Sequence, residues 1–244
     1  MISKAQLKKL RGLANKKQRK AQGQFLVQGE KSVVELLHSS LSIVELFASQ
    51  EFCDKHESLI GNTTTTLCSL EELSKASSLS ANDSAIAVVQ IPTTNALFTN
   101  EPIIALDDIN DPGNLGTILR VADWYGINNV IVSENTADEF NPKVISATMG
   151  AFTRVSVHRM NLEQYLATCN KPVMGAYLNG TSVHDAEFPE NTIILMGNES
   201  HGIAPHLERF VTQPITIPKY GQSESLNVAM ATGIILDNLK RKLS

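Results

Sequence analysis

Three clusters of polar residues each follow an apolar run of the chain, and their residue types are suited to holding or activating a substrate. The first cluster extends from Asp107 to Gly126 (DDINDPGNLGTILRVADWYG). Asn114 is a good N-cap for a helix predicted over 115–125. Arg120 lies about 120° around that helix and about 9 Å along it from Asn114. The spacing fits equally a surface arginine and a cation directed at the loop edge.

The second cluster, TIILMGNESHGI, spans 192–203. An apolar strand ends at Gly197, and Asn198, Glu199 and His201 follow it. In parallel α/β sheets, ligands bind outside the carboxyl ends of the strands, and a glycine lets a ligand approach the backbone closely. The alternative is a tight strand-to-helix turn in which the polar side chains only cap the helix.

The third cluster, ITIPKYGQSESLNVAMATGI, spans 215–234. A predicted strand ends at Pro218, and a polar loop leads to a helix with Ser225 and Asn227 at its mouth. Free backbone N–H groups at a helix start favour anions. Taken by itself, however, this cluster is better explained by ordinary helix capping.

Several common functional sites are missing from the sequence. It has no GxGxxG after the first strand of either half, no GxxxxGK[ST], no GxSxG and no HExxH. Its three cysteines are widely separated, which argues against a disulfide framework or a zinc site, and we expect no metal. The same cysteine usage favours a reducing cytoplasm. No run of 18 apolar residues and no secretory signal are present, so we expect no membrane span.

The net charge of −4 conceals a basic N-terminal arm. Residues 1–31 contain nine basic groups and one acid, a charge of +8, which leaves −12 for the remainder. Such an arm is suited to binding RNA phosphates, although a charge run more often marks only a solvated helix. The candidate RNA-binding residues are Lys8, Lys9, Arg11, Lys16, Lys17, Arg19 and Lys20.

The clusters require a framework of alternating strands and helices, which the hydrophobic pattern predicts in both halves of the chain. Residues 1–91 form a predicted α/β module that begins with a helix to about Lys20, and 92–100 (PTTNALFTN) form a linker. Residues 101–244 contain strongly apolar strands, which are typical of a parallel sheet with helices on both faces.

Taken in order, NLGTILRVADWYG, ILMGNESHGI and IPKYGQSESLNVAMATGI resemble the three motifs of the SpoU (TrmH-like) family in the SPOUT class of RNA methyltransferases. The resemblance covers roughly Glu101 to Ser244. It implies an α/β fold whose C-terminal part is threaded into a trefoil knot. The first half, with GQFLVQGEKSVVELL, resembles the small L30-like α/β domain that often binds the substrate in this family.

The resemblance also implies a reaction, in which a methyl group passes from S-adenosylmethionine to a ribose 2′-hydroxyl of RNA within a homodimer. Ribosomal RNA is favoured over transfer RNA as the substrate. The implied catalytic residues are Asn114, Arg120, Glu199, Ser225 and Asn227. The implied cofactor-binding residues are Met196, Gly197, Asn198, Ile217, Ser225 and Leu226.

The role of Arg120 has three alternatives. It removes the proton of the hydroxyl, it directs a neighbouring phosphate that relays the proton, or it only orients that phosphate. Two other functions compete with methyl transfer: an RNA-binding protein of the same fold that has lost catalysis, and a small-molecule enzyme on a doubly wound sheet. The presence of the whole polar set argues against the first, and the basic arm argues against the second.

Overall fold

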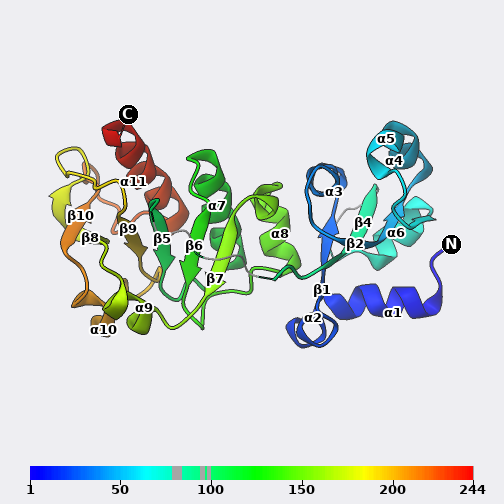
Figure 1. Ribbon diagram of the computed structural model, residues 1–244, viewed down its shortest axis with the longest axis horizontal. Coiled ribbons are helices and arrows are strands. Elements are labelled where there is room, and N and C mark those ends of the chain that lie inside the picture. Colours follow the sequence, from blue (N-terminus) through cyan, green and yellow to red (C-terminus); the bar gives the residue numbers. More distant parts are fainter. Residues whose placement is uncertain (79–83, 94–96, 98–99, 244) are drawn as a thin grey trace. The chain divides into compact units, whose positions relative to one another are not determined.

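The computed structural model describes residues 1–78, 84–93, 97 and 100–243 (Figure 1). The chain divides into two compact units. Unit 1 comprises Met1–Thr93 and Asp138–Thr153, and unit 2 comprises Thr94–Ala137 and Arg154–Ser244. The predicted linker over 92–100 falls partly on 94–96 and 98–99, which lie outside the described residues. In the described part, no helix is long and apolar enough to cross a membrane.

Unit 1 is built on a four-stranded mixed sheet with the order β1-β4-β2-β3. Strand β4 runs antiparallel to both β1 and β2, and β3 runs parallel to β2. Its strands are β1 (Gln24–Gln28), β2 (Ile43–Ala48), β3 (Thr65–Leu67) and β4 (Ala85–Gln90).

Helices cover both faces of this sheet. One apolar cluster joins Val27 and Ala87 of the sheet to Leu36 and Phe52, and a second joins Leu26 and other sheet residues to the first helix. The helical elements of unit 1 are α1 (Lys4–Leu13), α2 (Lys16–Gln22), α3 (Glu30–Leu37), α4 (Gln50–Lys55), α5 (Glu57–Ile60), α6 (Leu70–Ala76), α8 (Pro142–Thr148) and the 3-10 turn η1 (Ala151–Thr153). Helices α4 and α5 were not predicted from the sequence, because they are short.

The basic arm forms two helices, whereas the sequence predicted one helix to about Lys20. Helix α1 ends at Leu13, and the Asn15 side chain accepts a hydrogen bond from the backbone N–H of Lys17 at 2.8 Å. An asparagine that caps a helix in this way starts a new one, because its side chain satisfies an otherwise unpaired donor. The predicted capping box at Ser69 and Glu72 is present at the start of α6.

The segment Asp138–Thr153 belongs to unit 1, although it lies well beyond the boundary that the sequence suggested. Ile145 of α8 is part of the core of unit 1. The rings of Phe140 and Phe152 lie 4.8 and 6.3 Å from the ring of Phe25, measured between centroids. Apolar contacts of this kind bury surface that residues 1–93 alone would leave in water.

Unit 2 contains a six-stranded sheet with the order β10-β8-β9-β5-β6-β7, in which every neighbouring pair is parallel. This is the predicted parallel sheet. Its strands are β5 (Ile103–Leu106), β6 (Asn129–Val132), β7 (Ser156–Arg159), β8 (Val173–Ser182), β9 (Ile193–Met196) and β10 (Gln213–Thr216). Strand β7 was not predicted, because it is polar and lies at the edge of the sheet.

Both faces of this sheet are buried under helices, as predicted. Ile103 and Ala105 of β5 pack with residues of α9 and α10 on one face. Ile104 and Leu106 point to the opposite face and are also fully buried, and α7 and α11 pack against each other on this side (Figure 1). The helices of unit 2 are α7 (Pro112–Trp124), α9 (Leu162–Thr168), α10 (Pro205–Glu208) and α11 (Val228–Leu243).

Candidate active site

Three loops of unit 2 contribute to one hydrogen-bonded group of side chains. The loops follow β5, β9 and β10, and each begins at the carboxyl end of its strand. Asn114 lies in the first turn of α7, Glu199 follows β9, and Asn227 immediately precedes α11. The fold therefore brings together one polar residue from each of the three sequence clusters.

Asn114 is the centre of this group. Its Nδ2 donates a hydrogen bond to Oε1 of Glu199 at 2.7 Å, and its Oδ1 accepts one from Nδ2 of Asn227 at 2.8 Å. An amide is suited to this position because it carries a donor and an acceptor on one planar group. The Asn114 side chain thus links the second and third clusters directly.

Asp111, not the predicted Asn114, is the N-cap of α7. Its Oδ1 accepts the backbone N–H of Asn114 at 2.8 Å, and Pro112 occupies the first turn, where its missing N–H costs nothing. Asn114 is therefore inside the helix. Because Asp111 takes the capping role, the Asn114 amide is available for Glu199 and Asn227.

Asn227 caps α11, as the capping alternative predicted, and it also joins the group around Asn114. Its Oδ1 accepts the backbone N–H groups of Ala229 at 3.0 Å and Met230 at 3.3 Å, so it caps α11. Its Nδ2 remains available to donate to Asn114. Ser225 is exposed and has no hydrogen-bond partner in the described part of the chain, so the structure does not bring it into this group.

Arg120 lies further along α7 and is exposed. Within the described residues, its guanidinium forms no hydrogen bond or ion pair, including with Asn114, Glu199 and Asn227. Its five N–H donors are therefore available to an external acceptor, such as a phosphate.

Gly197 is required by the loop's own fold. A Cβ at this position would lie 2.2 Å from the backbone carbon of Gly202 and 2.2 Å from the backbone nitrogen of Ile203. Asn198 and Gly202 exchange two backbone hydrogen bonds, which close the turn. The close approach that the sequence attributed to a ligand is thus made by the returning backbone of the same loop.

The backbone after β10 is open to a ligand. Among the described residues, no backbone group between Ile217 and Leu226 takes part in a hydrogen bond. Tyr220 and Leu226 expose 91% and 52% of their surface in this loop. Unpaired backbone groups beside apolar side chains match the needs of a nucleoside, which has polar edges and a flat apolar face.

Asp107 and the backbone of Asp108 also belong to this region, although their sequence context did not predict it. Asp107 Oδ2 accepts the backbone N–H of Ala204 at 2.8 Å, and Asn198 Nδ2 donates to the carbonyl oxygen of Asp108 at 2.7 Å. Burial raises the pKa of the Asp107 carboxyl. The available signal was an acidic pair directly after a fully apolar strand.

The basic arm in unit 1 is only partly free for RNA. Arg19 is 2% exposed, pairs with Asp138 and donates to the carbonyl oxygens of Leu13 and Ala14, so its prediction as an RNA contact is wrong. Arg11 is exposed but donates to the Lys75 carbonyl oxygen at 3.0 Å. The remaining predicted contacts are the exposed Lys8, Lys16, Lys17 and Lys20 and the half-buried Lys9.

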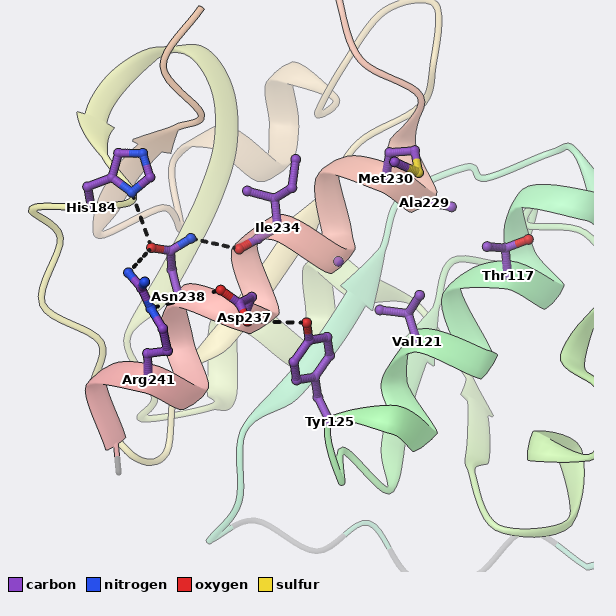
Figure 2. Close-up of a pocket in the computed structure, with 11 residues that line it drawn as sticks. Thr117, Val121, Tyr125, His184, Ala229, Met230, Ile234, Asp237, Asn238 and Arg241 are labelled. Atoms are coloured by element: carbon purple, nitrogen blue, oxygen red, sulfur yellow. Dashed lines mark hydrogen bonds and ion pairs between the residues drawn. The ribbon is translucent and has the colours of Figure 1, made fainter.

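A groove of about 430 Å³ lies between α7 and α11 in unit 2 (Figure 2). Tyr125 contacts Asp237 across it at 3.5 Å, and the exposed side chain of Met230 lies at one end. His184 and Arg241 both contact Asn238 at the other end. Asn114, Glu199 and Asn227 do not line the groove, although Ala229 and Met230 of its lining donate backbone hydrogen bonds to Asn227. In the described part of the chain, no cluster of metal-binding side chains is present.

Comparison with protein families gives two matches. The model of the SpoU rRNA Methylase family matches residues 101–237, and the model of the MRM3-like substrate binding domain matches residues 4–87. The first match includes all three loops that supply Asn114, Glu199 and Asn227. The second includes the basic arm.

Individual relatives extend over nearly the whole chain. The 23S rRNA (guanosine(2553)-2'-O)-methyltransferase RlmP of Bacillus subtilis is 32% identical, with 93% of each chain covered. A putative RNA methyltransferase of the TrmH family from Porphyromonas gingivalis has a TM-score of 0.87 at 32% identity, with 99% of each chain covered. An AdoMet-bound rRNA methyltransferase from Sinorhizobium meliloti has a TM-score of 0.88 at 26% identity, covering 100% of this chain and 98% of its own.

Proposed function

This chain belongs to the SpoU rRNA methylase family, and we infer that it transfers the methyl group of S-adenosylmethionine to a ribose 2′-hydroxyl of ribosomal RNA. The observation that carries this inference is the hydrogen-bonded group of Asn114, Glu199 and Asn227, with the unpaired Arg120 on the same helix as Asn114. The name of the Bacillus subtilis relative supports ribosomal RNA as the substrate, and we propose the cytoplasm as the place of action.

The chemistry of the loops after β9 and β10 fits S-adenosylmethionine. The unpaired backbone between Ile217 and Leu226 offers donors and acceptors to an adenine or to the methionyl part, and Leu226 offers an apolar surface. The residues that would hold the cofactor are Met196, Gly197, Asn198, Ile217, Ser225 and Leu226. When bound, the sulfonium supplies a methyl group that is already activated for transfer.

The protein's own contribution is alignment of the ribose and stabilisation of charge. Arginine normally keeps its proton, so we assign to Arg120 a paired contact with the phosphate beside the target ribose. The hydroxyl proton then leaves to that phosphate or to water. Asn114 holds Glu199 and Asn227 in one arrangement, which fixes the loops around the reacting groups.

RNA binding is assigned to the lysines of the basic arm. Lys8, Lys16, Lys17 and Lys20 are exposed, and together they place four positive charges on α1 and α2. Contacts of this type are made to phosphates and carry no base specificity. They would strengthen binding to RNA, and the choice of nucleotide would be made elsewhere.

We also propose a homodimer and a trefoil knot. Trp124 and Met230 expose 84% and 63% of their surface on α7 and α11, and such apolar exposure beside a groove is suited to a second copy of this chain. Strand β10 lies at the sheet edge next to β8, while α11 returns to pack on α7. The chain after β10 must therefore pass back across the end of the sheet, which is compatible with a knot.

The test is transfer of labelled methyl groups from S-adenosylmethionine to ribosomal RNA taken from a strain that lacks this protein. We expect label in ribosomal RNA and little label in transfer RNA. The labelled ribosomal RNA should resist alkaline cleavage at one nucleotide, because a 2′-O-methyl group blocks that cleavage. Cofactor and RNA binding without any transfer would support the inactive RNA-binding alternative instead. Mapping the 2′-O-methyl site that the deletion strain loses would identify the nucleotide.

A further inference from the structure

Two loops of unit 2 are tied together beneath the candidate active site. Asp107 follows β5, and its Oδ2 accepts the backbone N–H of Ala204, the last residue before α10, at 2.8 Å. Its own backbone N–H donates to the carbonyl oxygen of Met196 at 2.9 Å, which continues the pairing of β5 with β9. Asp107 is 4% exposed. A carboxylate this buried is costly unless it is hydrogen-bonded.

A second tie lies at the other end of the same loop. Asn198 Nδ2 donates to the carbonyl oxygen of Asp108 at 2.7 Å. Asp108 has a φ of 53°, in the left-handed region, and Ser133 holds it there. The Ser133 hydroxyl accepts the Asp108 N–H at 2.9 Å and donates to Asp108 Oδ1 at 2.7 Å. The loop 198–204 is therefore attached to the end of β5 at both of its ends.

Between these two ties the loop is a compact turn. Asn198 and Gly202 exchange backbone hydrogen bonds of 2.9 and 3.0 Å, and Asn198 Oδ1 accepts the Ser200 N–H at 2.8 Å. Glu199 lies inside this turn and reaches Asn114. A turn that is closed internally moves as one piece, so its position relative to β5 depends on the bonds from Asp107 and Asp108.

A carboxylate is a costly choice at this buried position, because a neutral acceptor could also bind the Ala204 N–H. Desolvation raises its pKa, the neighbouring Asp108 adds to this effect, and the Ala204 N–H and the exposed His206 and His201 oppose it. Among the described residues, the Asp107 carboxylate has one hydrogen-bond partner, which is the backbone N–H of Ala204 in this loop. A charged acceptor makes the stronger bond to an N–H group.

We propose that Asp107 is a positioning residue for the methyl donor: through the Ala204 N–H, it fixes the loop that carries Gly197, Asn198 and Glu199. This inference rests on the proposed cofactor role of that loop. Asp107 itself touches neither the donor nor the ribose in this proposal. Its loss should therefore weaken cofactor binding more than it slows transfer at saturating cofactor.

The experiment compares Asp107→Ala, Asp107→Asn and Thr192→Val in the full-length protein. Thr192 is a matched control because it is also buried and polar, but it donates to the Pro172 carbonyl oxygen at the opposite end of β9. Calorimetry with S-adenosylmethionine gives Kd, methyl transfer gives KM and kcat, and thermal unfolding gives Tm.

We expect Asp107→Ala to raise the Kd and KM for S-adenosylmethionine about tenfold, which corresponds to the loss of one charged hydrogen bond, while kcat changes much less. Asp107→Asn should restore only part of the affinity, because its amide oxygen still accepts the Ala204 N–H but without the charge that strengthens the bond. Thr192→Val should lower Tm without changing the Kd. Equal Kd values for wild type and Asp107→Ala, or a loss confined to kcat, would overturn the proposal.

Failure of the proposed function and failure of the Asp107 proposal give different results. If wild-type protein does not bind S-adenosylmethionine, the proposed function fails first. If Asp107→Ala does not fold, the pH dependence of Asp107→Asn decides. In wild type, protonation of Asp107 on acidification should weaken cofactor binding. Asp107→Asn should lack that component, since Asp108, His201 and His206 are common to both proteins. Identical pH profiles would overturn the proposal.

Discussion

Asn114 donates its side-chain amide to Glu199 at a distance of 2.7 Å, although 85 positions separate the two residues in the sequence. The same amide accepts from Asn227, 113 positions further along than Asn114. One planar group thus links the three loops that the family motifs define. The arrangement predicts that Asn114 matters for the reaction more than for the stability of the helix.

Replacing Asn114 by alanine should lower kcat/KM about tenfold or more, because Glu199 and Asn227 each lose a partner. The Tm should change little, since Glu199 and Asn227 are exposed and Asp111 still caps α7. Asn114→Asp should also lower activity, because it keeps an acceptor for Asn227 but brings a second carboxylate against Glu199. Methyl-transfer assays at varied RNA concentration measure kcat/KM. Wild-type values in both variants would contradict the linking role of Asn114.

Replacing Arg120 by alanine should lower methyl transfer about 100-fold or more and leave cofactor binding unchanged, because the guanidinium is proposed to contact only the RNA. The matched control is Arg209→Ala. Arg209 is also exposed, but it pairs with Glu163 at 2.6 Å on the side of the sheet that α9 and α10 cover. Single-turnover transfer and calorimetry with S-adenosylmethionine separate the two effects. Near-normal transfer by Arg120→Ala would remove it from the mechanism.

The basic arm is better tested by substitution than by deletion. Removing α1 would also remove Leu10 and Leu13, which are buried in the core of unit 1. Changing Lys8, Lys16, Lys17 and Lys20 together to glutamine should weaken RNA binding and reduce the salt slope by about 0.7 for each phosphate that is no longer neutralised. RNA affinity measured over a series of salt concentrations gives that slope. An unchanged slope would mean that the arm is only a solvated surface.

The buried pair of Arg19 and Asp138 should stabilise unit 1. Its Nε–Oδ2 distance is 3.2 Å, and Arg19 is almost fully buried. Arg19→Met should lower the free energy of unfolding by about 3 kcal/mol, because it leaves a nearly buried carboxylate without its partner. Lys20→Met is the control, since Lys20 is exposed next to it. Equal unfolding midpoints in denaturant for the two variants would contradict this role.

Stability should fall on acidification partly through His158. Its ring Nε2 lies 3.0 Å from Asn129 Oδ1 on β6, and burial lowers its pKa. The unfolded chain therefore takes up a proton at a higher pH than the folded chain. The contribution of His158 to stability should be complete above about pH 6.5 and should decrease as the pH falls from there towards the lowered pKa. His158→Gln should reduce this Tm loss, whereas the exposed His38→Gln should not. Equal pH dependence in all three proteins would exclude His158.

The local elements of the molecule follow from local sequence signals. The apolar runs around Ile104 and Ile194 predicted buried parallel strands, and capping patterns such as Ser69 with Glu72 predicted helix starts. Short or polar elements were missed, among them α4 and β7, because their hydrophobic period is too short to recognise. The ordered motifs also identified the family, since three loops at strand ends need particular residues in a particular order.

Tertiary structure decided which polar residues come together in the candidate site and which are buried in hydrogen bonds within the protein. The sequence marked Asn114 as a helix cap and, through the family motif, as a catalytic residue, and it marked Arg19 as an RNA contact, but it showed the partners of neither. In the fold, Asp111 takes the cap and leaves Asn114 to join distant loops, whereas Asp138 returns from the second half of the chain to bury Arg19. The physical reason is that hydrogen bonds and ion pairs act over a few ångströms in space. Sequence spacing shows which residues are neighbours along one helix or strand. The long-range partners are determined only when the strands take their order in the folded sheet.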